Sequence, residues 1–115
     1  MPPQIKIINL EEDRPTVNRM RLRLDRALAL ARSEGTSILK LIHGYGSSGV
    51  GGALRPAVHS SLLRYKDAGL IREFIDGEDF RISNEATWAL LKRMPDMKQD
   101  RDLGRGNKGI TIVVM

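Results

Sequence analysis

The apolar residues of this chain follow two different periods. Short runs rich in Ile, Val and Leu are typical of buried strands. Between them lie longer stretches whose apolar residues recur every three or four positions, as on one face of a helix. The predicted strands are Gln4–Leu10, Ser37–His43, Leu70–Phe74 and Ile110–Val114. The predicted helices are Thr16–Ser33, Ala53–Lys66 and Asn84–Met94.

Residues that favour helix ends support these boundaries. Thr16 is suited to cap the first helix and Gly35 to end it. Pro56 fits the first turn of the second helix, where no amide donor is needed. Ser83 is suited to cap the third helix, and Pro95 stops it.

The order of these elements, β-α-β-α-β-(α)-β, predicts an α/β fold. A strand–helix–strand unit of this length implies a parallel strand pair joined by a crossover helix. We therefore expect a two-layer sandwich, in which a mixed four-stranded sheet packs against two main helices. The chain has 115 residues, the usual size of one domain, so residues 1–115 are predicted to form a single domain.

The charge balance indicates the kind of partner. The chain has 19 Lys and Arg against 14 Asp and Glu, a net charge of +5 and a pI near 10.0. Such a basic chain favours polyanions such as nucleic acid. The absence of cysteine excludes disulfides, thiol catalysis and thiolate metal sites. The sequence has no apolar run that could cross a membrane and no recognisable export signal, so the expected location is the cytoplasm.

A glycine-rich segment, Gly44–Gly52, lies between the second predicted strand and the second predicted helix. Glycines let the main chain approach a ligand closely, and the amides of a helix N-terminus favour an anion. Gly44, Gly46 and Gly49 have the spacing of the dinucleotide-binding motif. That interpretation is rejected because the helix begins too late and the chain is too short for two mononucleotide-binding halves. The glycines and the helix N-terminus that follows them still predict that this segment contacts phosphate groups.

Two side chains beside this segment are candidates for chemistry. His43 ends the preceding strand and is either a structural hydrogen-bonding residue or a functional one. Arg55, placed in the first turn of the second helix, is suited to bind a phosphate through two hydrogen bonds. No group of His, Asp and Glu has the spacing of a metal site, so no metal is predicted.

Other basic and aromatic residues leave alternatives open. Arg19, Arg23 and Arg26 lie on one side of the first helix and form either a solvated face or secondary phosphate contacts. Trp88 either packs in the core or stacks on a base. The aromatic content is only 4%, which favours electrostatic, sequence-tolerant binding over base stacking.

Several stretches together resemble the small MutS-related (Smr) domain family. They are the Leu- and Ala-rich helix after Thr16, the strand that ends in His43-Gly44-Tyr45-Gly46, and the helix start Gly52-Ala53-Leu54-Arg55. The final segment, Gly109–Val114, is similar to the closing strand of the family. The resemblance implies an α/β sandwich similar to the C-terminal domain of translation initiation factor 3. It also implies DNA or RNA binding, and several members of the family are nicking endonucleases.

The resemblance also implies site residues. Nucleic-acid contacts are expected at His43, Gly44, Tyr45, Gly46, Gly52 and Arg55. The family usually has an L-D-x-H-G motif after the first strand. Here that place reads Leu10-Glu11-Glu12, and Tyr45 replaces a frequent lysine. The catalytic candidates are therefore His43 and Glu11, and nuclease activity is expected to be weak or absent. A segment of about residues 75–107, which holds the third helix, is interpreted as an insertion.

The sequence predicts a nucleic-acid-binding domain that contacts phosphates through residues 43–55. One alternative is a structure-selective nicking endonuclease, and a second is a protein-interaction or dimerisation module. No cofactor is predicted unless the domain is a nuclease that uses Mg²⁺ or Mn²⁺. The sequence does not distinguish DNA from RNA, or a monomer from a homodimer.

Overall fold

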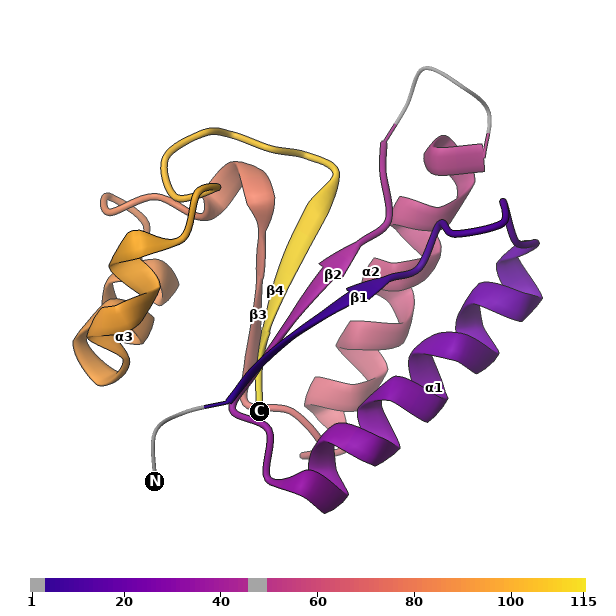
Figure 1. The fold of residues 1–115 in the computed structure, drawn as a ribbon, viewed down its shortest axis with the longest axis horizontal. Coiled ribbons are helices and arrows are strands. Elements are labelled where there is room, and N and C mark those ends of the chain that lie inside the picture. The colour runs from indigo at the N-terminus through magenta and orange to yellow at the C-terminus, as the bar shows by residue number, and fades with distance from the viewer. Residues whose placement is uncertain (1–3, 46–49) are drawn as a thin grey trace.

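The computed structural model describes residues 4–45 and 50–115 (Figure 1). The helices are α1 (Val17–Glu34), α2 (Val50–Asp67) and α3 (Glu85–Arg93). The strands are β1 (Ile5–Asn9), β2 (Ile38–Ile42), β3 (Glu73–Asp76) and β4 (Ile110–Val114). Two short 3₁₀ helices, η1 (Gly77–Asp79) and η2 (Pro95–Gln99), flank α3. The predicted order of elements is confirmed. None of the helices in the described residues is long and apolar enough to span a membrane.

The four strands form one mixed sheet in the order β1-β2-β4-β3. β1 and β2 are parallel, with Ile5 opposite Ile38, because α1 carries the chain back between them. β4 runs antiparallel to both of its neighbours, β2 and β3. The prediction of a mixed four-stranded sheet is therefore confirmed.

Helices cover both faces of this sheet (Figure 1). α1 and α2 lie on one face, where their apolar side chains pack against the strands in a core that includes Met20, Leu24, Leu28, Leu39, Leu41 and Leu62. α3 lies on the opposite face, over a core that includes Ile38, Phe80, Leu90, Leu91 and Ile112. The two main helices and the sheet make the predicted sandwich, and α3 adds a third layer. That layer does not extend over β1, whose Ile5 and Ile7 stay exposed.

Both ends of α1 agree with the sequence. The Thr16 hydroxyl accepts a hydrogen bond from the Arg19 amide at 3.2 Å, which satisfies one of the free donors at the helix start. Gly35 closes the helix with a left-handed φ of 69°, a conformation that glycine adopts without strain. The predicted cap and stop are thus confirmed.

The start of α2 differs from the prediction. The helix begins at Val50, three residues before the predicted Ala53. The early start was not predicted because the glycines at 51 and 52 have low helix propensity. Pro56 consequently lies inside the helix and not in its first turn. Its ring removes the donor that would bond to the carbonyl of Gly52.

The third strand and third helix also begin later than predicted. The strand was expected over Leu70–Phe74 but spans Glu73–Asp76, because β4 offers partners only from Val114, which lies opposite Glu73. The side chains of Leu70 and Ile71 pack in the core before the strand starts. The cap of α3 is Asn84 and not Ser83, since the Asn84 side chain accepts from the Thr87 amide at 3.0 Å.

A buried lysine ties the segment before β4 to the centre of the sheet. Lys40 of β2 faces the α3 side, where its Nζ lies 2.9 Å from Asp100 Oδ1 and forms a second ion pair with Asp102. Asn107 donates to Asp102 at 3.0 Å, and the Gly109 carbonyl accepts from the Gly44 amide at 3.0 Å. The segment from 100 to 109 is thereby held beside the loop that follows β2.

Candidate functional site

His43 is fully buried at the end of β2. Its Nδ1 donates to the Gly44 carbonyl at 2.7 Å, so its Nε2 accepts from the Thr111 hydroxyl at 2.9 Å. Burial lowers the pKa of the imidazole, and the charge of Arg55 pushes it the same way, so the ring is neutral at physiological pH. A ring without exposed surface cannot reach a phosphate in this conformation. The geometry favours a structural role, and the predicted roles of His43 as base or phosphate ligand receive no support from it.

Gly44 and Tyr45 begin the loop after β2. Gly44 has a φ of 68°, and a side chain there would collide with the Glu11 carboxylate. Tyr45 is 54% exposed, and the Lys108 ammonium lies 5.4 Å from the centre of its ring, within the range of a cation–π contact. The predicted contact residue Gly46 lies outside the described residues.

A cleft of about 330 Å³ opens beside this loop. It is lined by Tyr45, Gly52, Arg55, Pro56 and His59. The four residues from α2 recur at spacings of three and four, so they share one helix face. Arg55 lies in the second turn of α2 and not in the predicted first turn, because the helix starts earlier than expected.

Two carboxylates border the cleft from the end of β3 and from η1. Arg55 Nη2 lies 2.6 Å from Glu78 Oε1, and both side chains are partly exposed, at 28% and 41%. His59 Nε2 is paired with Asp76 Oδ1, and these side chains are 31% and 19% exposed. An anion that enters the cleft must therefore compete with Glu78 for Arg55.

His59 and its partner were missed by the sequence reasoning, which gave this histidine no role. The signal that could have found it is the four-residue step from Arg55, which puts both side chains on the same face of α2. Asp76 could not have been assigned, because only the sheet brings it there. It lies opposite Thr111 in the β3–β4 ladder.

Glu11, the second catalytic candidate, lies in a different cavity. It lines a space of about 410 Å³ together with Gly44, Lys40, Asp102 and Asn107. The structure thus brings Tyr45, Gly52 and Arg55 together but does not place Glu11 among them. Within residues 4–45 and 50–115, no group of three or more His, Asp and Glu side chains could hold a metal ion.

The arginines of α1 divide into two kinds. Arg23 is partly buried and donates to the carbonyls of Glu12, at 2.9 Å, and Leu10, at 3.4 Å, so it fixes the turn after β1. Arg19 and Arg26 are exposed, which fits either a solvated face or secondary phosphate contacts. Trp88 is half exposed on α3, with the Lys92 ammonium 5.4 Å from the centre of its ring.

Comparison with known proteins identifies the relatives of this fold. The family described as "Smr domain" matches residues 14–92 of the chain, a range that includes all the residues that line the cleft. The crystal structure of the Smr domain of Thermus thermophilus MutS2 is similar, with a TM-score of 0.58 and 28% sequence identity over 95% of each chain. No curated protein matches the chain.

Proposed function

The chain belongs to the Smr domain family, and from this premise we propose that it binds nucleic acid by its phosphates in the cleft between Tyr45 and His59. The family is known for nucleic-acid binding and for nucleases. The observation that carries the proposal is the convergence of Tyr45, Arg55 and His59 on one open cleft beside the first turns of α2. A helix N-terminus attracts anions through its free amides and its dipole.

Arg55 and Tyr45 of the cleft, with the neighbouring Lys108 and Glu78, have distinct parts in this proposal. Arg55 offers a planar fork of donors that matches two phosphate oxygens. Lys108, held over Tyr45, adds a second cation, and the half-exposed tyrosine hydroxyl has no hydrogen-bond partner among the described residues. Glu78 opposes binding, because the phosphate must displace it from Arg55. We expect moderate affinity, since part of the Arg55 interaction is already satisfied in the free protein.

The same arrangement predicts binding that depends on charge and tolerates any base sequence. Among the described residues, Tyr45 is the only Phe, Tyr or Trp that lines the cleft, which leaves little aromatic surface for reading bases. Two or three cations that replace counterions on a phosphate backbone give a corresponding salt dependence.

The first prediction concerns salt. Affinity for single-stranded, duplex and branched DNA and RNA should fall by roughly 10- to 40-fold between about 50 and 200 mM salt. Electrophoretic binding assays with probes of equal length and unrelated sequence measure this directly. An affinity that stays constant over that range, or that depends mainly on base sequence, would contradict the proposal.

A second candidate function, phosphodiester cleavage, is favoured by the His59–Asp76 pair. A histidine that is oriented by a carboxylate and lies beside an arginine is a common arrangement for general base catalysis. In this reaction His59 takes a proton from an attacking water or ribose hydroxyl, whose oxygen then bonds to phosphorus. The bond to the leaving oxygen breaks, and that oxygen takes a proton from solvent. Arg55 stabilises the charge that develops on the phosphate.

The second prediction tests this candidate. If the domain cleaves nucleic acid, His59→Gln should lower the cleavage rate by about 100-fold or more while leaving binding nearly unchanged. Asp76→Asn should lower the rate as well. Purified protein is incubated with structured RNA and supercoiled plasmid, with EDTA or with Mg²⁺ or Mn²⁺. Absence of cleavage by the unaltered protein, or full cleavage by His59→Gln, would rule out this candidate and leave the binding function intact.

A further inference from the structure

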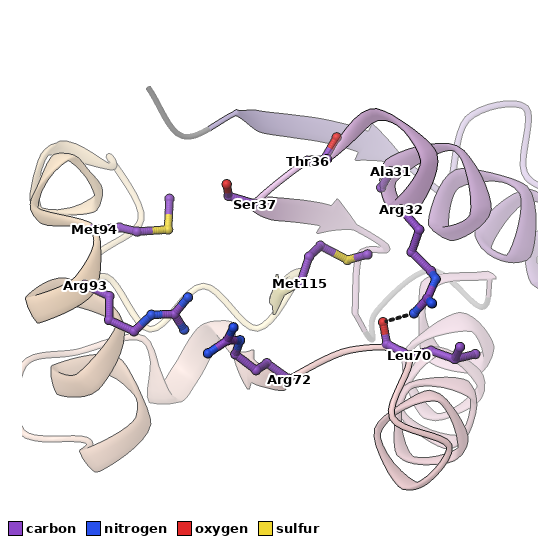
Figure 2. Close-up of a pocket in the computed structure, with 10 residues that line it drawn as sticks. Ala31, Arg32, Thr36, Ser37, Leu70, Arg72, Arg93, Met94 and Met115 are labelled. Atoms are coloured by element: carbon purple, nitrogen blue, oxygen red, sulfur yellow. Dashed lines mark hydrogen bonds between the residues drawn. The ribbon is translucent and has the colours of Figure 1, made fainter. Parts of the chain in front are cut away.

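A second cationic cavity lies at the opposite end of the sheet from the Tyr45–His59 cleft. Its volume is about 580 Å³, and its walls come from the end of α1, the start of β2, the approach to β3 and the end of α3 (Figure 2). β2 alone separates the two ends by about 15 Å. This cavity is therefore distinct from the proposed nucleic-acid cleft.

Three arginines line the cavity, and none of the described residues lines it with an acidic side chain. Arg32 donates to the Leu70 carbonyl at 2.9 Å. Arg72 and Arg93 are exposed, and their guanidinium groups point toward one another (Figure 2). Neither forms an ion pair with any group of the described residues, including the main-chain end at Met115.

The acidic residues near this end of the sheet are engaged elsewhere. Glu34, at the end of α1, pairs with Lys6, and Glu73, beside Arg72, pairs with Lys66 at 2.9 Å. Two like charges that face one another without a counterion repel, and a bound anion relieves the repulsion. The positions of Arg32 and Arg93 also suit helix C-termini, which favour cations. That reason does not apply to Arg72, which lies in no helix.

Two hydroxyl groups complete the cavity wall between α1 and β2. Ser37 is half-buried, and Thr36 is more than nine-tenths buried. The Thr36 Oγ1 has no hydrogen-bond partner among the described residues. Because Thr36 Oγ1 has almost no exposed surface, the half-buried Ser37 is the hydroxyl group that the cavity presents to a ligand.

We propose that this cavity binds a phosphate monoester carried by a nucleotide. A monoester has a charge of about −1.5 to −2 at neutral pH, which matches the two unpaired guanidinium groups, whereas a phosphodiester supplies only one charge. The cavity volume lies in the range that encloses a small organic ligand and not only an ion. Met94 and Met115 give the cavity an apolar wall against which a base can pack.

The nucleotide can be free or can be the phosphorylated end of a strand, and the test separates these sources. Isothermal titration uses adenosine, adenosine 5′-monophosphate, inorganic phosphate, and two short oligonucleotides that differ only in a 5′-phosphate. Binding of the monophosphate but not of adenosine is expected. Preference for the 5′-phosphorylated oligonucleotide over its 5′-hydroxyl form, with no binding of the mononucleotide, would identify the strand end as the source. Equal binding with and without the phosphate would overturn the proposal.

The matched variants place the ligand in this cavity. The double variant Arg72→Gln, Arg93→Gln should lower monoester affinity by at least about tenfold. The control double variant Arg81→Gln, Arg105→Gln removes the same charge from exposed positions elsewhere and should change it little. Equal losses of monoester affinity in both variants would show that only net charge matters and would contradict binding in this cavity. Arg55→Gln should leave monoester binding unchanged, so failure of this proposal is distinguishable from failure of the nucleic-acid cleft.

Discussion

Replacing Lys40 with methionine should destabilise the domain by about 2–4 kcal/mol. The Lys40 side chain is 7% exposed, and its partners Asp100 and Asp102 are only 15% and 10% exposed. Removal of the ammonium leaves two poorly solvated carboxylates close together without a counterion. Loss of one partner from a buried ion pair typically costs about 3–5 kcal/mol, and the remaining exposure of the aspartates places our expectation slightly lower.

A matched variant separates this effect from a general loss of charge. Lys6→Met removes a lysine from the neighbouring strand β1, where its ion pair with Glu34 is partly exposed, at 33% and 40%. That change should cost less than about 1 kcal/mol, because solvent screens exposed pairs. Urea unfolding followed by circular dichroism measures both variants. Equal losses in the two variants would show that Lys40 does not hold the 100–109 segment in place.

The same ion pairs set a pH range for stability. Burial alone would lower the pKa of Lys40, but the bonds and charges of Asp102 and Asp100 outweigh it and raise the pKa above 10.5. Burial alone would raise the pKa of Asp102, but the bonds from Lys40 and Asn107 outweigh it and lower the pKa below 3.8. The Asp102 contribution is therefore lost as the pH falls through its lowered pKa. The Lys40 contribution is lost as the pH rises through its raised pKa. Compared with the unaltered protein, Lys40→Met should lose less stability when the pH is moved to either extreme.

The fold was largely predictable because its main signals are local. Thr16 and Gly35 mark the ends of α1, and the period of the apolar residues identifies the helices. The shifted start of β3 was not predictable. Leu70 and Ile71 have strand-like sequence, but pairing is decided by where β4 ends, at Val114 opposite Glu73. The early start of α2 was hidden by glycines, which lower helix propensity but do not prevent a helix.

The candidate site was predictable only in part, because burial and pairing are tertiary properties. Arg55 and Tyr45 lie in the cleft, as their position beside the glycine-rich segment suggested. His43 has a strand-end position that suits either a functional or a structural residue, and only its contacts with Thr111 and Gly44 favour the structural one. Glu78 reaches Arg55 from 23 residues away along the chain. No local pattern in the sequence indicates that contact.

Variants of Arg55 and Glu78 test phosphate binding in the cleft most directly. In our account, phosphate and Glu78 compete for the same guanidinium group, so the two residues should have opposite effects on affinity. Arg64→Gln is the matched control, because it removes the same charge from the exposed side of α2 about 13 Å further along the helix. The Arg55–Glu78 pair is partly exposed, so these variants should change stability little.

The deciding measurement is the affinity of the three variants for one nucleic-acid probe at low salt, with thermal unfolding as a check on folding. Arg55→Gln should weaken binding by about 10- to 100-fold, as expected for a lost charge-assisted phosphate contact. Arg64→Gln should weaken it only slightly, and Glu78→Gln should strengthen it. Equal weakening by Arg55→Gln and Arg64→Gln, or weaker binding by Glu78→Gln, would contradict the assignment of this cleft as the phosphate-binding site.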